Sequence, residues 1–382
     1  MSIDDRFLTA NYARQPIEFV RGLGARLWDA SEVEYLDLQT GLAVNGVGHC
    51  HPVVVEAIRA QASSLIHVGN VFYNDPMVRL AQRLAGVAQL GEGTRVFFTN
   101  SGTEAVEAVL KCARKRRRAG TIVSVHGGFH GRSYGALSAT PQESKQAPFA
   151  PLVPGFFAVE PTAEAITAAV DGQTAAVILE PIQGESGVHC LGADVLRAAR
   201  AACDAHGAAL IFDEIQCGLG RTGDLWAWQD SGVVPDAVTV AKALAGGLPI
   251  GALLAGPEMA GVFAPGDHGS TFAGGPVQCA AALAVLDIVT DEALLARVRD
   301  AGERMTARLA ELPRVREVRG RGFMQAITLE DVDATALVSR ALREQQLVIN
   351  ATSPSTLRLL PPLIISEADL DEALSRLARL LA

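Results

Sequence analysis

Residues 236–252 read DAVTVAKALAGGLPIGA and combine a short apolar run, a single lysine and a glycine-rich turn. Residues 237–240 are rich in valine and threonine, follow a proline and precede two glycines, which predicts a buried β-strand. Lys242 comes directly after this run. Burial disfavours a charged amine, and a neutral lysine is a nucleophile that can condense with an aldehyde. A lone lysine more often keeps its charge in water at the surface, so the surrounding sequence decides between these interpretations.

Similar apolar runs recur along the chain and alternate with amphipathic segments. The runs expected to form buried strands are residues 95–98, 121–125, 175–179, 208–212 and 237–240, and two of the helical segments between them are residues 104–115 and 193–205. This alternation predicts an α/β fold with a mostly parallel sheet covered by helices on both faces. Ligands of such sheets bind at the carboxyl ends of the strands. The residues that follow each strand are therefore the candidate site residues.

A turn of small residues, Ser101, Gly102 and Thr103, follows the first of these runs and precedes a helical segment. Free backbone N–H groups at a helix start, with hydroxyl groups beside them, are suited to bind an anion such as a phosphate. The alternative is that Ser101 or Thr103 only caps the helix.

The second run ends in HGGFHGRS, residues 126–133. Its glycines allow sharp turns that can present Phe129 and Arg132 to a cleft. A planar guanidinium can bind both oxygens of a carboxylate. Core packing of Phe129 and a surface ion pair of Arg132 are the alternatives, and His130 is expected to be a hydrogen-bonded structural residue.

Asp213 follows the run at residues 208–212 directly, so its carboxylate is expected to be partly buried and to need a cationic partner. Lys242 follows about one strand–helix–strand unit later, which predicts that both side chains lie at the same edge of the sheet. The run at residues 175–179 leads into EPIQGESG, which contains Glu185.

Composition excludes several classes of protein. The chain has 382 residues, enough for two domains, and a formal net charge of −9, which argues against a general nucleic-acid-binding protein. The basic run RKRRR at residues 114–118 is expected in the last turn of a helix, where cations are stabilised.

The six cysteines are scattered without CxxC pairs or Cys/His metal spacing, so no metal site and a reducing, cytoplasmic location are expected. The N-terminal residues lack the apolar core of a signal peptide, and no apolar run is long enough to cross a membrane.

Taken together, these segments resemble the class III, fold-type I aminotransferases, which use pyridoxal 5′-phosphate. The similarity covers almost the whole chain and includes YLDLQTGLAVNGVGHCHP, FFTNSGTEAVEA, GFHGRSYGALSAT, EPIQGESGV, IFDEIQCGLGRTG, AKALAGGLPIGA, HGSTFAGGP and LRLLPPL. The resemblance implies a large sheet domain and a smaller α+β domain. The expected division is an N-terminal segment (1–50) packing with the small domain, a large cofactor-binding domain (51–265), and a connecting segment with the small domain (266–382).

The resemblance also implies roles at the cofactor. Lys242 would hold the cofactor covalently and move the substrate proton, and Asp213 would pair with the pyridinium nitrogen. The other implied contacts are Ser101, Gly102 and Thr103 at the phosphate, Phe129 on the ring face, Gln216 near the phenolic oxygen, and Thr271 from a neighbouring subunit. A homodimer with shared active sites is therefore implied.

The closest similarity within the family is to enzymes that act on the terminal amine of N-acetylornithine, a step of arginine biosynthesis. The acceptor would be 2-oxoglutarate, and the products N-acetylglutamate semialdehyde and glutamate. The resemblance assigns the distal carboxylate to Arg132 and the carboxylate near the cofactor to Arg358, with Glu185 pairing with Arg358 until the dicarboxylate enters. An ordinary ion pair between Glu185 and Arg358 is the alternative.

Other interpretations stay open at this point. Alternative donors are succinyldiaminopimelate, ornithine, 4-aminobutyrate and a carrier-bound aminoadipate derivative, and a protein of this fold without turnover, serving as a binding module, is the alternative of another class. Ala273 and Gly275 depart from the family's TFGGNP segment, which puts the loop after Thr271 in doubt. Near the C-terminus, Ser366 and Asp369 predict the start of a last helix.

Overall fold

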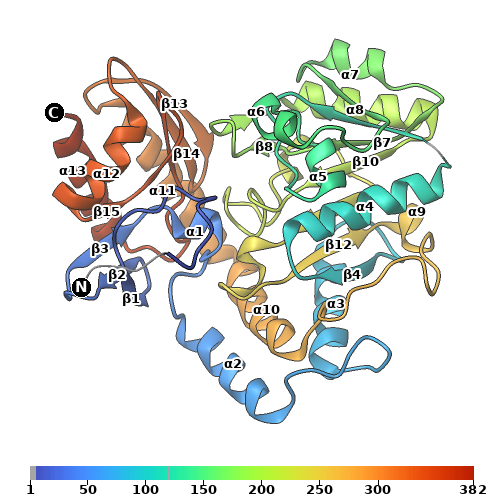
Figure 1. The fold of residues 1–382 in the computed structure, drawn as a ribbon, viewed down its shortest axis with the longest axis horizontal. Coiled ribbons are helices and arrows are strands. Elements are labelled where there is room, and N and C mark those ends of the chain that lie inside the picture. The colour runs from blue at the N-terminus through green and yellow to red at the C-terminus, as the bar shows by residue number, and fades with distance from the viewer. Residues whose placement is uncertain (1–5, 119) are drawn as a thin grey trace.

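The computed structural model describes residues 6–118 and 120–382 (Figure 1). Its largest sheet has seven strands in the order β4-β12-β11-β10-β7-β5-β6. In that order they span Arg95–Thr99, Gly251–Ala255, Ala237–Val240, Ala209–Asp213, Thr174–Leu179, Thr121–Val125 and Phe156–Val159. Strand β12 runs antiparallel to both its neighbours, and β11, β10, β7, β5 and β6 pair in parallel. The predicted mostly parallel sheet is therefore confirmed.

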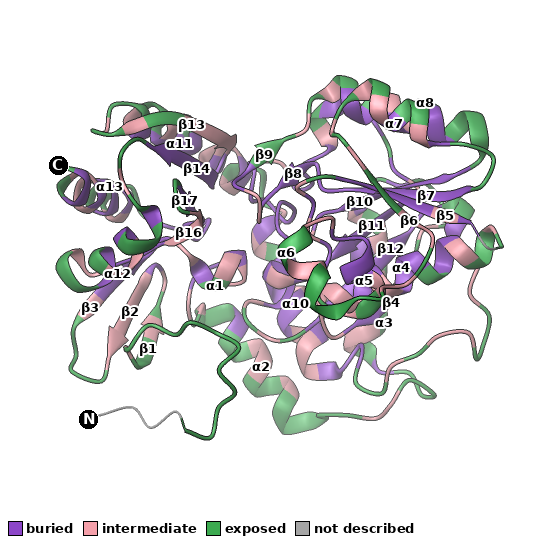
Figure 2. Ribbon diagram, turned by 45° about the horizontal axis from the view of Figure 1, so that its top comes forward, coloured by how far each residue is buried: buried purple, intermediate pink, exposed green. Residues whose placement is uncertain are grey.

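Helices cover both faces of this sheet because its strands bury side chains alternately on either side (Figure 2). Ile178 and Ile211 pack in the same apolar cluster as Val109 of α4 (Gly102–Arg116). Their chain neighbours Val177 and Leu210 belong to the other main cluster, with side chains of α8 (Ala193–His206) and α10 (Pro276–Val289). Both faces are apolar, so the strands read as continuous apolar runs in the sequence.

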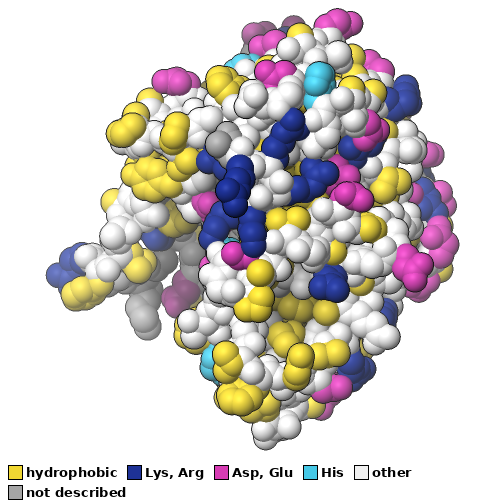
Figure 3. Space-filling model, turned by 90° about the vertical axis from the view of Figure 1, so that its right-hand side faces the viewer, with side chains coloured by type: hydrophobic (Ala, Val, Ile, Leu, Met, Phe, Trp, Pro, Cys, Tyr) yellow, Lys and Arg dark blue, Asp and Glu magenta, His cyan; other side chains and the backbone are white. Residues whose placement is uncertain are grey.

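The basic run lies at the end of α4, as predicted, with Arg114, Lys115 and Arg116 in the last helical turn. Figure 3 shows Lys and Arg side chains gathered on this side of the molecule. Several of them donate hydrogen bonds to main-chain carbonyls, such as Arg116 to Gly207 (2.9 Å) and Arg114 to Pro154 (2.7 Å). These bonds attach the end of α4 to neighbouring loops.

Segments from both ends of the chain form a second group of elements, on the left of Figure 1. It holds the sheets β13-β14-β17-β16 and β1-β2-β3-β15 with helices α11, α12 and α13. The strands β1, β2, β3, β13, β14, β15, β16 and β17 span Phe19–Leu23, Arg26–Asp29, Glu34–Asp37, Val315–Arg321, Met324–Leu329, Leu347–Val348, Asn350–Ser353 and Thr356–Leu359, and the three helices Glu292–Ala310, Ala334–Gln345 and Glu367–Leu381. Because β3 pairs with β15, the N-terminal strands belong to the same sheet as C-terminal residues. The domain boundaries at residues 50 and 265 stay a prediction.

Two local features complete the fold. The last helix starts as predicted, since the Asp369 N–H donates to the Ser366 hydroxyl oxygen at 3.0 Å. Residues 40–43, which form α1 (Thr40–Ala43), all have positive φ, between 51° and 69°. The Thr40 hydroxyl donates to the Leu360 carbonyl at 2.8 Å, which ties this left-handed turn to the C-terminal part of the chain.

Within the described residues, all six cysteines are free, no group of three or more His, Cys, Asp or Glu side chains could hold a metal ion, and no helix is both long and apolar enough to cross a membrane.

Candidate active site

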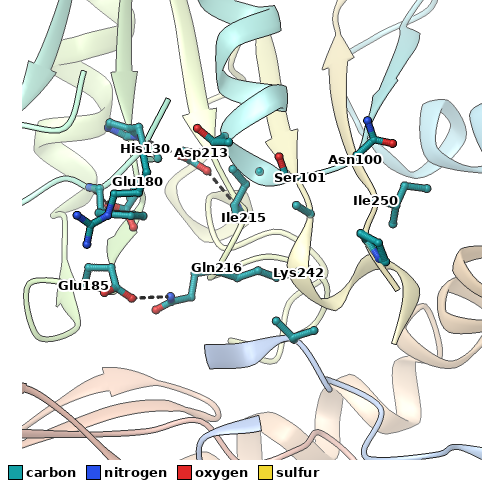
Figure 4. A pocket seen from close by; sticks show the side chains of 18 of the residues that line it. Asn100, Ser101, His130, Glu180, Glu185, Asp213, Ile215, Gln216, Lys242 and Ile250 are labelled. Atoms are coloured by element: carbon teal, nitrogen blue, oxygen red, sulfur yellow. Dashed lines mark hydrogen bonds and ion pairs between the residues drawn. The ribbon is translucent and has the colours of Figure 1, made fainter. Parts of the chain in front are cut away.

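A cavity of about 560 Å³ lies at the carboxyl ends of the central strands (Figure 4). Five strand ends contribute to it, because the residues that follow β4, β5, β7, β10 and β11 all line its wall. The predicted site residues in the lining are Ser101, Gly102, Thr103, Phe129, Arg132, Glu185, Asp213, Gln216 and Lys242. Thr271 and Arg358 are absent from the lining. The predicted residues that line the cavity thus come from five separate segments of the chain, which the fold brings together.

Lys242 begins a short 3₁₀ turn, η3 (Lys242–Ala245), directly after β11. Its φ of 42° lies in the left-handed region, where a non-glycine residue costs about 1–3 kcal/mol and tends to mark a functional site. Burial lowers the pKa of its amine, and Arg358 adds to this effect, although Glu185 acts in the opposite direction. The shift favours the neutral, nucleophilic form of the amine.

Asp213 is the last residue of β10 and is only 2% exposed. Its Oδ2 lies 2.8 Å from Nδ1 of His130, and its Oδ1 accepts hydrogen bonds from the Thr239 hydroxyl and the Ile215 N–H, both at 3.1 Å. Burial alone would lower the pKa of His130, but the hydrogen bond and charge of Asp213 raise it. The expectation that His130 is hydrogen-bonded is confirmed, whereas its pairing with Asp213 was missed.

A carboxylate offers about four acceptor positions, of which Asp213 uses three within the protein. One position therefore remains for a donor inside the cavity. The side chains of His130 and Thr239 hold the carboxylate in place for it.

Glu180 is a cavity residue that sequence reasoning did not assign to the site. Its two carboxylate oxygens accept hydrogen bonds from the N–H groups of Phe129 (2.7 Å) and Gly184 (3.2 Å). Burial raises the pKa of this carboxyl group to about 7. The sequence signal was its position directly after the apolar run at residues 175–179, the same signal that identified Asp213.

Arg358, on β17, lies behind the cavity wall and is 1% exposed. Its Nη1 donates to Oε1 of Glu185 at 2.8 Å and to Oε1 of Gln216 at 2.9 Å. Its Nε donates to Oδ1 of Asn350 at 2.9 Å. The predicted pairing of Glu185 with Arg358 is present, and it connects the second group of elements to the cavity.

The start of α4 faces the cavity with Ser101, Gly102 and Thr103. The Ser101 hydroxyl oxygen accepts a weak hydrogen bond from the Glu104 N–H at 3.3 Å, so the capping interpretation is correct and the residue lines the cavity as well. A Cβ added to Gly102 would lie 2.9 Å from the Ile215 side chain, so a larger residue there would require Ile215 to move. This helix start can receive a phosphate.

Thr271 is exposed and lies away from the cavity of its own chain. Its loop is nevertheless fixed, because the Asn70 amide donates to the carbonyls of Ser270 and Ala273, both at 2.9 Å. The Asn100 amide, which lies at the cavity, donates to the Ser270 hydroxyl at 2.8 Å. Further along, Gly275 is the residue before α10.

Tyr12 and Asn100 are cavity residues that the sequence did not identify.

The cavity residues together fit pyridoxal phosphate. Phe129 offers a ring face, Asp213 retains one acceptor position, and the N-terminus of α4 offers N–H groups to a phosphate. Lys242 offers an amine that burial keeps reactive.

Comparison with known proteins gives consistent results. The sequence model of the family described as "Aminotransferase class-III" matches residues 8–381. The acetylornithine aminotransferase of Methanopyrus kandleri is 45% identical over 376 residues, covering 98% of this chain and 96% of that protein. The crystal structure of the ornithine aminotransferase from Toxoplasma gondii superposes with a TM-score of 0.93 at 32% identity, covering 99% of this chain and 93% of that chain. That of the N-acetylornithine aminotransferase from Stenotrophomonas maltophilia gives a TM-score of 0.84 at 35% identity, covering 99% and 97%.

Proposed function

Because this chain belongs to the class III aminotransferases, we propose that it transfers the terminal amino group of N-acetylornithine to 2-oxoglutarate, giving N-acetylglutamate semialdehyde and glutamate. The enzyme is a pyridoxal-phosphate-dependent aminotransferase. The observation that carries the proposal is the cavity in which Lys242, Asp213 and Arg132 converge.

The protein's own groups divide the work at the cofactor. Pyridoxal phosphate, when bound, supplies an electron-withdrawing ring that stabilises the charge left on a carbon when its proton is removed. Lys242, whose amine burial favours in the neutral form, would hold the cofactor covalently and would take up and return the substrate proton. Asp213, fixed by His130 and Thr239, would supply a negative charge to the ring nitrogen.

Further residues would orient the cofactor. Ser101, Gly102 and Thr103 at the start of α4 would bind the phosphate. Phe129, whose N–H donates to Glu180, would stack on the ring. Gln216, which donates to Glu185 at 3.4 Å, would hydrogen-bond near the phenolic oxygen.

Substrate selection rests on two arginines. Arg132 lines the cavity and binds the carboxylate at the end of the substrate remote from the reacting amine. Arg358 stays paired with Glu185 while the donor is bound, which removes a second carboxylate site next to the cofactor. With 2-oxoglutarate, the α-carboxylate displaces Glu185 from Arg358.

We also propose that the active enzyme is a homodimer, in which Thr271 completes the phosphate site of the other subunit. Large apolar side chains are exposed near the Thr271 loop, including Val71 (88%), Tyr73 (90%) and Phe272 (65%). Exposed apolar side chains in such number suit a protein interface. Asn70 connects the segment at residues 70–73 to the Thr271 loop, since its amide donates a hydrogen bond to the Ser270 carbonyl.

A cytoplasmic location is part of the proposal and is supported by the free cysteines.

The test is a donor screen monitored by the absorbance of the cofactor. N-acetylornithine should give the highest kcat/KM when compared with ornithine, succinyldiaminopimelate, 4-aminobutyrate and a carrier-bound aminoadipate derivative. A rank among the poorest donors would contradict the substrate assignment. Failure of glutamate to change the cofactor's absorbance would favour a binding module without turnover. Ornithine is the second candidate, because the Toxoplasma gondii ornithine aminotransferase has the higher TM-score of the two structures compared.

A further inference from the structure

Two cations lie close to the ring of Phe129. The guanidinium carbon of Arg132 lies 5.6 Å from the ring centroid, and Nζ of Lys145 lies 5.7 Å from it. Arg132 is exposed and lines the cavity, whereas Lys145 is half-buried and lies outside the lining. Positive charge near Phe129 is therefore present both in the cavity lining, at Arg132, and outside it, at Lys145.

Lys145 is held in this position by the loop that carries Phe129. It lies on α6 (Glu143–Gln146), and its Nζ donates a hydrogen bond to Oε1 of Gln142. The amide nitrogen of Gln142 donates in turn to the Gly128 carbonyl at 3.0 Å. Both cations are thus attached, directly or through one side chain, to the turn at residues 127–132.

Their charges are not balanced by the protein. Among residues 6–118 and 120–382, neither Arg132 nor Lys145 forms an ion pair. The pKa of Lys145 is lowered by burial and then by repulsion from Arg132, with Glu185 as the acidic group that opposes them. Glu185 is already bonded to Arg358 at 2.8 Å. The region thus has an excess of positive charge, which an anionic ligand would neutralise.

We propose that Arg132 and Lys145 form a two-cation subsite for amino donors that carry two carboxylates at the end remote from the reacting amine. Arg132 takes the α-carboxylate, as in the proposed function on which this inference rests. Lys145 takes a second carboxylate at the end of an acyl arm on the α-nitrogen. Because Lys145 lies outside the cavity lining, a carboxylate must extend past the lining residues to reach it. A succinyl arm has that chemistry, and an acetyl arm does not.

Two donors isolate the second carboxylate. N-acetylornithine and N-succinylornithine share the reacting amine and the α-carboxylate and differ in the acyl arm. Lys145→Gln should lower kcat/KM about tenfold for N-succinylornithine and less than about threefold for N-acetylornithine, since a charge-assisted hydrogen bond contributes at that level. Lys145→Arg should restore kcat/KM for N-succinylornithine to near the wild-type value. Arg316→Gln removes one exposed cation on β13, away from the cavity lining, and should change neither value.

Binding without turnover gives an independent readout. N-acetylnorvaline and N-succinylnorvaline lack the terminal amine, so calorimetry on the cofactor-loaded enzyme measures the subsite alone. Lys145→Gln should weaken N-succinylnorvaline about tenfold and leave N-acetylnorvaline nearly unchanged, with the difference shrinking as salt screens the charges.

Each contrary outcome is distinguishable. Equal losses for both ligands would show that Lys145 only supports Phe129, and no loss would show that Lys145 does not reach the ligand. Either result overturns the subsite while the proposed function stands. If the wild-type enzyme uses neither donor, the proposed function fails and the subsite fails with it.

Discussion

At the scale of single residues, the positions after apolar strands were the informative ones. Asp213 and Lys242 could be predicted because a charged residue directly after a buried run is costly unless it has a use. His130 as the partner of Asp213 could not, because a hydrogen bond between two different strand ends depends on how those strands neighbour each other. Lys145 gave no signal at all, since a lysine on a polar turn usually points into water.

Lys242→Ala should abolish steady-state transamination, lowering kcat by more than about a thousandfold, because no other lysine among the described residues lines the cavity. The variant should still bind pyridoxal phosphate through its phosphate and ring contacts. Stopped assays of glutamate formation, with dialysis to measure retained cofactor, check both statements. Near-normal turnover would contradict the role of Lys242.

Glu214 provides a test of pH dependence. Its carboxylate is buried, accepts hydrogen bonds from the N–H groups of Ala227 (2.9 Å) and Trp228 (3.1 Å), and burial raises its pKa from 4.5 to about 7. Between these values the folded state holds a proton that the unfolded chain has released. The free energy of unfolding should therefore fall as the pH rises from about 4.5 to about 7.

Glu214→Gln removes this titration. The slope of the free energy of unfolding against pH should become shallower by at most about 1.4 kcal/mol per pH unit, whatever the change in absolute stability. Urea titrations at half-unit pH steps measure the slope. Glu180 has a pKa raised in the same direction, so part of the slope should remain. An unchanged slope would show that Glu214 is ionised throughout.

At the scale of elements, the five strands predicted for the large sheet all exist, whereas β12 and β6 of the same sheet were missed. The GALLA sequence of β12 follows a glycine-rich turn and was read with it, and β6 is an apolar run of only four residues after a segment with three prolines. The left-handed turn at Thr40–Ala43 was also unpredictable. Three of its four residues are not glycine, and contacts such as the Thr40–Leu360 hydrogen bond are what hold it.

The start of α3 (Asp75–Val87) gives a prediction at this scale. Oδ1 of Asn74 accepts the Met77 N–H at 2.9 Å, and its amide donates to the Gly274 carbonyl at 3.3 Å, so one side chain caps the helix and holds the loop after Thr271. Asn74→Ala should lower the free energy of unfolding by about 1–2 kcal/mol.

Asn74→Asp is the matched control, because it keeps the capping oxygen, whereas the carboxylate that replaces the amide carries a charge and cannot donate to the Gly274 carbonyl. It should lie between wild type and Asn74→Ala in urea denaturation at fixed protein concentration. Equal stability of all three proteins would show that the cap contributes nothing.

At the scale of the whole molecule, the sequence predicted the α/β class. That the two ends of the chain share one sheet was implied only by the family resemblance. The contact between β3 and β15 joins residues more than three hundred positions apart in the chain, and two short strands carry too little pattern to reveal their pairing. The surface proposed to join two subunits could not be predicted either, because the sequence at residues 71–73 does not distinguish an interface from an ordinary exposed loop.

The double variant Val71→Glu with Tyr73→Glu should shift the protein to monomers, because it places charges where apolar contacts are proposed. Activity should fall with the loss of the dimer. Sedimentation velocity and kcat measured at the same concentrations check this. Val234→Glu changes another exposed apolar residue and should leave both unchanged. A fully active monomer would contradict shared active sites.

The outward position of Thr271 has a consequence for mixtures of two defective proteins. If each subunit lends its threonine to the other, a pairing of Lys242→Ala with Thr271→Ala contains one active site with both defects and one with none. Randomly reassociated chains would then recover up to about a quarter of the wild-type sites, although neither parent is fully competent. Such a recovery of activity, measured as a reaction rate, would show that Thr271 of one subunit completes the active site that contains Lys242 of the other.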